Sequence, residues 1–443
     1  MIFHHPGQSA SAYARKTFSS LGTRNYRLYF TGQGISLCGT WMQMIGQALL
    51  VLKLTNSGTA LGLVTALQYL PILLFAPGGG IVADRFDKRR VLFVTQSSSA
   101  VQALMLASLV ATNAVRLWMV FVLAALLGFT NAVDNPTRQA FIHELVGGEQ
   151  LRNAVTLNSI EVNLTRVIGP AIAGVLIAVV GLAPCFFVNA ASYAAILLAL
   201  GLMRKEELLT GEPVARAKGQ LREGFRYVRD TPVLRDTLVM MGIIGTLTFE
   251  FGVALPLISR YTFNSGAKGL ALLTAFMGAG AVLGGLATAG RRRTSPRGLI
   301  WVALAFGAAM LLASAAPSLV LCVAAMALVG VFSVIFISLG NTILQLESAP
   351  NMRGRVMALW SIAFLGSTTI GGPIIGLVGT HASARWHWLS AASPRWPPIS
   401  SGLSRCGVTR PTKLLLSWCS SSRSPRKKTR VTYEEELALS CSP

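Results

Sequence analysis

The chain has 443 residues, of which 52% are hydrophobic and only 13% are charged, and its mean hydropathy is +0.56. Ordinary soluble domains carry about 25% charged residues, so this composition argues against a soluble protein and indicates a membrane protein. The net charge of +22 could suggest nucleic-acid binding. That function requires a basic face on a soluble module, however, and the sequence shows no such module.

Apolar windows of about 20 residues recur along the chain, and each is long enough to cross a hydrocarbon core as a helix. The first 25 residues lack the apolar core of a cleavable signal peptide, so we expect the first window to be retained. We predict eleven membrane-spanning helices, at residues 28–52, 59–82, 91–112, 116–136, 156–180, 183–203, 237–259, 269–290, 298–316, 318–345 and 356–379.

Lys and Arg residues are distributed unequally between the two sides of these spans. Before the tail that begins at residue 381, the segments on the side of the N-terminus hold 24 of them and the opposite segments hold 4. Cytoplasmic loops carry such an excess of positive charge. We therefore expect a multi-pass protein of the plasma (cytoplasmic) membrane with its N-terminus in the cytoplasm.

The longest polar stretch between spans follows the sixth span and divides the chain into halves. Shifting the sequence by 203 residues aligns Gly169 with Gly372 and Pro170 with Pro373, which favours a parallel repeat of six-helix units. We expect a cytoplasmic N-terminal segment, a first bundle, a cytoplasmic linker, a second bundle with five clear spans and a basic tail, at residues 1–27, 28–203, 204–236, 237–380 and 381–443.

A dense charge cluster follows the second span, in GGGIVADRFDKRR (78–90). Its glycine and charged positions resemble the GxxxDRxGRR signature between helices 2 and 3 of the major facilitator superfamily, although Asp87 stands where the superfamily usually has Gly. Three further segments resemble the siderophore and drug exporter branch, which includes the enterobactin exporters: DNPTRQAF (134–141), NAVTLNS (153–159) and NLTRVIGPAIAG (163–174). The resemblance covers residues 20 to about 380.

This resemblance implies an all-α polytopic membrane protein built from two six-helix bundles. It also implies that Gly80, Asp84, Arg85 and Arg89 form a conformational latch, in which Asp84 faces the amide end of helix 11, near Arg355, where a carboxylate is favoured. The alternative is a basic loop that only sets the topology.

Ionisable groups inside a membrane are costly and usually face a cavity or a partner. Asp134 and Arg138 are four residues apart on one helical face, so we expect a local ion pair or a gate that exchanges partners. Arg166 is either a coupling or substrate-orienting cation or a structural clamp to Asp134 or another helix.

Two carboxyl groups are further candidates for the coupling or substrate path. Glu161 lies about two turns inside its helix. Its side chain is expected either to reach the cytoplasmic rim of the membrane or to lie in a cavity. Glu250 lies near the middle of helix 7, where burial disfavours the ionised form, so it either carries the coupling proton or stays permanently protonated. Four aromatic residues are candidates for apolar walls of a substrate cavity, with packing inside the bundle as the alternative: Trp41, Phe249, Phe251 and Trp360.

Gly169 with Pro170 and Gly372 with Pro373 lie inside helices 5 and 11. Proline removes a helical hydrogen bond and glycine thins the helix. We expect these pairs to allow bending and close packing at the interface between the halves.

The amino-acid composition changes after Gly379. The sequence there is rich in Ser, Pro, Trp and Arg and contains no twelfth apolar span. Moving the reading frame by one base turns the five codons around Trp386, Trp388 and Trp396 into apolar codons. We therefore expect that a frameshift near residue 385 replaced the twelfth helix; a divergent tail is the alternative.

The pattern favours a secondary active transporter that expels a small amphipathic compound in exchange for protons. There are two alternatives: a symporter that takes up a solute, and a membrane protein that does not transport because its last helix is missing. No catalytic constellation, metal cluster or nucleotide-binding loop is found, so we expect no enzyme, cofactor or metal. The expected partners are a small-molecule substrate, protons and the lipid bilayer, without nucleic acid, and we expect a monomer.

Overall fold

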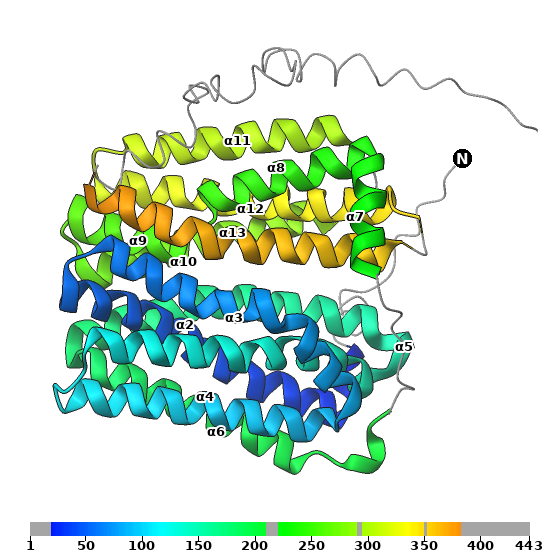
Figure 1. Ribbon diagram of the computed structural model, residues 1–443. Helices are drawn as coiled ribbons and strands as arrows, with labels where there is room; N and C mark the ends of the chain where they lie inside the picture. The colour runs from blue at the N-terminus through cyan, green and yellow to red at the C-terminus, as the bar shows by residue number, and fades with distance from the viewer. Residues whose placement is uncertain (1–18, 210–219, 290–294, 350–351, 382–443) are drawn as a thin grey trace, which may run out of the picture. The chain divides into compact units, whose positions relative to one another are not determined.

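The computed structural model describes residues 19–209, 220–289, 295–349 and 352–381 (Figure 1). The expected tail and the proposed frameshift site lie outside the described residues, as do most of the N-terminal segment and part of the linker. The described chain is helical and contains no strand. This agrees with the expected all-α class.

Eleven helical segments of the described chain are long and apolar enough to cross a membrane. The first half contains η1 (Ser19–Gly22), α2 (Arg24–Thr55), α3 (Gly58–Arg85), α4 (Lys88–Ala111), α5 (Leu117–Val180) and α6 (Leu182–Leu202). After η2 (Lys205–Glu207) and α7 (Gln220–Asp230), the second half contains α8 (Pro232–Thr248), α9 (Phe251–Leu257), η3 (Ile258–Thr262), α10 (Gly266–Ala289), α11 (Pro296–Ala315), α12 (Leu319–Leu346) and α13 (Arg353–His381).

The fourth and fifth spans are joined within α5 instead of being separated by a loop. The backbone leaves the helical region at Gly147, whose φ is 69° and ψ is 178°. Glycine adopts a positive φ without the clash that a Cβ would cause. The two spans, Leu117–Gly147 and Asn153–Val180, therefore reverse direction in a short kink.

The seventh span is interrupted at the position where a continuous helix was expected. Helix α8 ends at Thr248, α9 begins at Phe251, and Glu250 between them has φ −81° and ψ 46°. A π-helical turn, η3, follows α9. Helix breaks at membrane depth are tolerated where the backbone is buried in protein or lines a cavity.

The expected linker contains a helix, α7, that the polar sequence did not predict. Its Glu223 pairs with Arg355 at the start of α13 at 2.6 Å, and the backbone N–H of Ala349 donates to the Tyr227 hydroxyl at 3.1 Å. These contacts attach α7 to the second half, beside α13 and α8 (Figure 1).

Asp87, which departs from the superfamily signature, begins helix α4. Its carboxylate accepts hydrogen bonds from the backbone N–H groups of Arg89 at 2.9 Å and Arg90 at 3.3 Å. These N–H groups have no partner within the helix, and Asp is among the residues preferred at this capping position. The turn is therefore closed by a side chain.

The helix ends define two ends of the bundle. The turns at 56–57, 112–116 and 263–265 lie at one, called here the Asn56 end. Those at 86–87, 203–204 and 347–349 lie at the other, the Arg85 end, at the right of Figure 1.

Hydrogen bonds join the segments of the first half at the Arg85 end. Asn25 donates to the carbonyl of Arg204 at 2.8 Å, and Tyr26 donates to the carbonyl of Ala154 at 2.9 Å. Further bonds to carbonyl oxygens run from Arg24 to Leu202 and from Arg89 to Leu200 and Gly201, and Lys88 pairs with Glu144 at 2.6 Å. This set of contacts is called the first-half rim.

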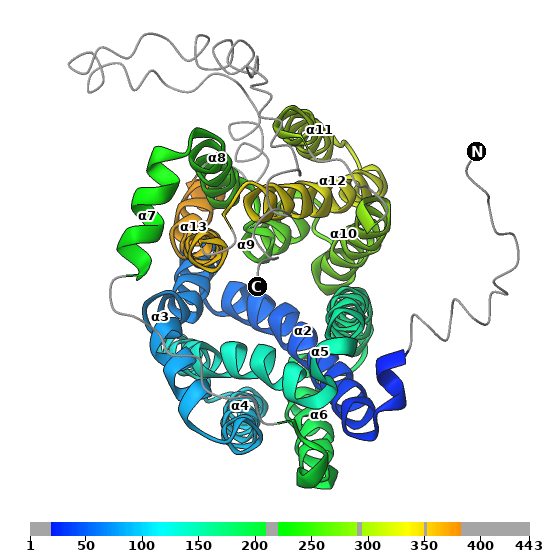
Figure 2. The same ribbon diagram turned by 90° about the vertical axis from the view of Figure 1, so that its right-hand side faces the viewer.

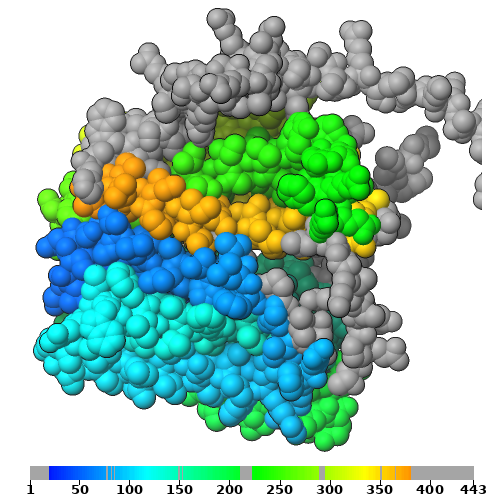
Figure 3. All heavy atoms as spheres, in the orientation of Figure 1, coloured from blue at the N-terminus to red at the C-terminus, as the bar shows by residue number. Residues whose placement is uncertain are grey.

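The two halves meet along α3 and α13 (Figures 2 and 3). Gly62 faces the carbonyl oxygen of Gly372, and Gly58 faces that of Gly376. The backbone N–H of Thr59 also donates to the Thr380 hydroxyl at 3.2 Å. Small residues let helix backbones approach closely in membranes. These four glycines are called the glycine seam.

Other contacts join the halves at or toward the Asn56 end. A Cβ on Gly174 of α5 would touch Ala271 of α10. Asn56 accepts hydrogen bonds on its side-chain oxygen from Arg260 at 2.6 Å and on its carbonyl oxygen from Tyr261 at 2.7 Å. The halves are therefore held together at this end.

Many large apolar side chains lie exposed on the spans, among them Val94, Val175, Val179, Trp301 and Val320. A soluble monomer rarely exposes so much contiguous apolar surface. Their exposure is expected where hydrocarbon chains surround the helices.

Candidate functional site: a cavity between the two halves

A cavity of about 190 Å³ lies between the two halves, near the middle of the spans. Helices α2, α3 and α5 line it from the first half, and α9, α10, α12 and α13 line it from the second. A cavity shared by two repeats at mid-membrane is the usual place for the substrate site of a secondary transporter.

Arg166 of α5 projects into this cavity from the first half. Its guanidinium carbon lies 4.9 Å from the ring centroid of Trp41 of α2, a cation–π contact. The buried Nε of Arg166 has no hydrogen-bond partner. Asp134 pairs with Arg138 and not with Arg166, so the expected clamp to Asp134 is not seen, whereas the contact with Trp41 links Arg166 to another helix, α2.

Glu250 lines the cavity from the second half. Its side chain is 3% exposed, its carboxyl group interacts with the hydroxyl of Thr368 on α13, and its Oε1 has no partner. Gly371 leaves the space for it, since a Cβ there would lie 2.9 Å from Cγ of Glu250. Glu250 thus lies at the helix break, not within a regular helix.

Tyr69 of α3, which the sequence analysis did not single out, also lines the cavity. It lies within electrostatic range of both Arg166 and Glu250. The signal in the sequence is its spacing from Thr65, another lining residue, because residues four apart share one helical face.

Aromatic side chains form much of the remaining wall. Trp41, Phe249 and Phe251 line the cavity as expected, together with Phe364. Trp360, which was also expected there, does not line it, and its ring stacks on Phe364 at 5.4 Å. The rings of Phe249 and Phe251 are 6.0 Å apart, and those of Phe249 and Phe364 are 6.1 Å apart. The cavity therefore combines two ionisable groups with an apolar wall.

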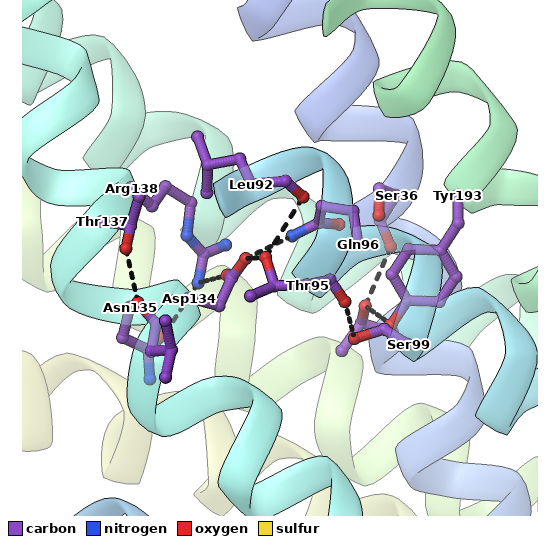
Figure 4. A network of polar contacts seen from close by, with 12 residues as sticks. Ser36, Leu92, Thr95, Gln96, Ser99, Asp134, Asn135, Thr137, Arg138 and Tyr193 are labelled. Carbon is purple, nitrogen blue, oxygen red and sulfur yellow. Dashed lines mark hydrogen bonds and ion pairs between the residues drawn. The ribbon is translucent and has the colours of Figure 1, made fainter. Parts of the chain in front are cut away.

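Asp134 and Arg138 form an ion pair inside the first half, with Nη2 of Arg138 3.4 Å from Oδ2 of Asp134. Oδ1 of Asp134 accepts hydrogen bonds from Thr95 at 2.7 Å and from Gln96 at 2.8 Å (Figure 4). Arg138 also donates to the side chain of Asn135 at 2.7 Å. These residues do not line the cavity.

Glu161 is buried inside the first half, with 4% of its surface exposed, and it is not among the residues that line the cavity. Neither the rim position nor the cavity position expected for it is therefore seen. It lies against Gly34 of α2, and its Oε1 has no partner. It lies within electrostatic range of Arg138. The side chain of Glu161 is packed between helices and does not extend to solvent.

The expected latch is only partly visible in the structure. Gly80 is buried and Arg85 is exposed, whereas the side chain of Asp84 lies outside the described ones. Arg89 donates to carbonyl oxygens of α6, in its own half. Arg355, near the expected partner of Asp84, pairs with Glu223 of α7.

The two Gly-Pro pairs differ in what they contact. Gly372, followed by Pro373, faces Gly62 across the glycine seam. Gly169, followed by Pro170, packs against Trp41 and Cys38 of α2, within the first half. The expected position between the halves is therefore correct for Gly372 and wrong for Gly169.

Both α5 and α13 continue as helices through their prolines, and the non-helical dihedrals recorded inside α5 belong to Gly147. Within the described ranges, no three His, Cys, Asp or Glu side chains gather closely enough to hold a metal ion.

Two helical halves around a central cavity define a membrane transporter of the major facilitator fold. Residues 15–394 match the family described as transmembrane secretion effector, and the chain belongs to this family of the major facilitator superfamily.

Characterised relatives are transporters. The chain is 30% identical over 239 residues to the staphyloferrin A transporter of Staphylococcus aureus, a match that covers 54% of this chain and 60% of that relative. It is 26% identical to the enterobactin exporter EntS of Shigella flexneri, over 80% of this chain and 85% of the relative. It is also 26% identical to the multidrug efflux pump Tap of Mycolicibacterium fortuitum, over 78% and 88%.

Solved structures show the same fold. The nucleoside transporter NupG aligns with a TM-score of 0.64 at 14% identity, over 83% of this chain and 95% of that one. A bacterial homologue of the iron transporter ferroportin, in an inward-facing state, aligns with a TM-score of 0.61 at 15% identity, over 83% and 96%.

Proposed function

We propose that this transporter exports a small amphipathic compound across the plasma membrane in exchange for protons, with Glu250 carrying the proton. The observation that carries the proposal is the position of Glu250. It is a buried carboxyl group with an unpartnered oxygen, on the wall of a cavity that both halves share.

A coupling group must reach the cavity and must exist in two protonation states during the cycle. An ionised carboxylate needs water or a partner. The carboxyl group of Glu250 would therefore release its proton when the hydrated cavity opens to the cytoplasm, and it would bind a new proton when the cavity opens to the exterior. Its place at the break between α8 and α9 lets the surrounding backbone change without unwinding a regular helix.

Alternating access requires that one end of the cavity be closed while the other opens. The glycine seam and the bonds to Asn56 hold the halves together toward the Asn56 end, and the distribution of Lys and Arg favours this end as the outer one. The conformation is thus the one expected when the cavity exchanges with the cytoplasm. Export is favoured over uptake by the relatives described as exporters and efflux pumps.

Proteoliposomes with an imposed proton gradient test this proposal. Wild-type protein should show gradient-driven flux of fluorescent amphipathic compounds in the export direction, and Glu250→Gln should remove the dependence on the gradient while inserting normally. Gln keeps the shape of the side chain but cannot exchange a proton. Unchanged coupling in Glu250→Gln would exclude this residue as the carrier, and accumulation in the opposite direction would indicate uptake.

The C-terminal sequence supplies the control for a transport-inactive protein. The assay should compare the chain carrying its present C-terminal sequence with a version in which the reading frame after codon 385 is restored. Flux only from the restored version would show that the tail inactivates the chain, and the nucleotide sequence would reveal the apolar frame directly.

A further inference from the structure

We propose that the cavity binds an amphipathic organic anion, whose negative group contacts Arg166 and whose apolar body lies against the aromatic wall. This inference rests on the proposed function, because it takes the cavity between the halves to be the substrate site.

Arg166 has no negative partner within the described part of the chain. The ion pairs found there join other residues, and the buried Nε of Arg166 has no acceptor. Its closest recorded neighbour is the ring of Trp41. A guanidinium with five donors therefore faces the cavity with at least one buried donor unused.

The contrast with Arg138 shows that the fold can supply an anion to an arginine within a membrane span. Arg138 is paired with Asp134 at 3.4 Å and bonded to Asn135 at 2.7 Å. Both arginines lie in α5, yet only Arg138 is neutralised. An unpaired cation inside a membrane is unfavourable, so a ligand that brings a carboxylate or another planar anion to Arg166 gains an interaction that the protein leaves open.

The rest of the cavity suits the apolar part of such a compound. Trp41 holds one face beside Arg166, and Phe249, Phe251 and Phe364 form an aromatic wall in the second half. Met44 adds a flexible apolar side chain, of a type that adapts to ligands of different shape. The ligand class is therefore one negative group on an aromatic or aliphatic body.

The anion also defines the electrical consequence of transport. Exchange of one entering proton for one departing monoanion moves two positive charges inward in net terms. The inside-negative membrane potential would then drive export directly.

Three probes that share one ring system test the inference: 2-naphthoate, 2-naphthylmethanol and 2-naphthylmethylammonium. Equilibrium dialysis against the full chain in nanodiscs of zwitterionic lipid, with empty nanodiscs subtracted, measures binding without any gradient. Wild-type protein should bind 2-naphthoate at least tenfold more tightly than the alcohol or the ammonium compound.

Arg166→Gln should lower the affinity for 2-naphthoate to that of the alcohol and leave the affinity for the alcohol unchanged, whereas Arg166→Lys should retain part of the preference. Arg229→Gln removes the same charge from an exposed position on α7 and should behave as the wild type. Equal loss in the Arg166 and Arg229 variants would overturn the inference, because it would reflect overall charge.

The wild-type ranking stands as a test even where a variant fails to fold. Absence of 2-naphthoate binding, or equal binding of the three probes, overturns the anion inference. Proton-driven export of neutral or cationic compounds would at the same time leave the proposed function intact. Conversely, anion-selective binding without proton-driven flux would reject the coupling and keep the ligand class.

Discussion

At the scale of single residues, Asp134 joins two helices through its two oxygens. Oδ1 accepts from Thr95 and Gln96 of α4, and Oδ2 pairs with Arg138 of α5 (Figure 4). Removing one partner of a buried ion pair leaves an uncompensated charge. Asp134 therefore stabilises the fold of the first half as well as the position of Arg138.

We expect Asp134→Asn to lower the free energy of unfolding by about 3 kcal/mol, because Arg138 loses its counter-charge. Thermal unfolding of the purified protein in detergent measures the change. The matched control is Asp87→Asn, which makes the same substitution at an exposed helix cap where Asn is equally effective. If both variants unfold at the wild-type temperature, the buried pair does not contribute to stability.

The sequence predicted local relations between residues better than distant ones. The spacing of Asp134 and Arg138 by one helical turn indicated their pair, because helical geometry alone brings them together. The stacking of Arg166 on Trp41 depends on how α5 packs against α2. The burial of Glu161 against Gly34 has the same origin. Neither can be read from spacing along one helix.

At the scale of helices, the glycine seam determines how closely α3 approaches α13. A Cβ on Gly62 would overlap the carbonyl oxygen of Gly372 and would lie 2.9 Å from Cα of Pro373. Both neighbours are backbone atoms, which cannot rotate away as a side chain would. A larger residue at Gly62 must therefore separate the two helices.

We expect Gly62→Ala to open the Asn56 end. In a background without the chain's own cysteines, a cysteine replacing Thr65 in the cavity should react with an impermeant maleimide at least several-fold faster from that end. Gly242→Ala in α8 is the control, because a Cβ there meets nothing within 4 Å. Equal reactivity in the two variants would show that the seam does not control access.

The apolar windows predicted all eleven spans, since hydrocarbon thickness imposes their length. Two local features were missed. A connection was expected between the fourth and fifth spans, but helix continues through most of it and only Gly147 departs from helical dihedrals. The interruption at Glu250 lies inside an apolar stretch, where window averages do not resolve a single residue. Helix α7 was missed because its sequence is polar, and its attachment to Arg355 comes from tertiary contact.

At the scale of the whole molecule, the distribution of basic residues makes a prediction about orientation. Cysteines placed at the exposed positions Lys53 and Lys268 should react with an impermeant reagent added to intact cells, because these positions lie at the Asn56 end. A cysteine at the exposed position Arg85 should react only after the cells are opened. The reverse pattern would contradict the charge rule for this chain and the assignment of the closed end to the exterior.

The polar stretch at 204–236 and the repeat of Gly169 and Pro170 at Gly372 and Pro373 predict a division into two halves. The contacts between the halves could not be predicted in this way. The repeat indicates that the halves are similar, but it does not indicate which of their surfaces touch. The two Gly-Pro pairs illustrate this, since one packs inside its own half and the other on the opposite one.

The first-half rim has a consequence for how mutations would act. Asn25, Tyr26 and Arg89 bond to the ends of neighbouring segments. In the proposed alternating-access cycle, we therefore expect these helix ends to move together and the half to change position as a single body. A substitution at the rim would then loosen that body without favouring either state, whereas one in the contact between bodies would change the ratio of the two conformers. Damage at these two places should therefore be distinguishable in one molecule: the first lowers the yield of folded protein, and the second alters its turnover.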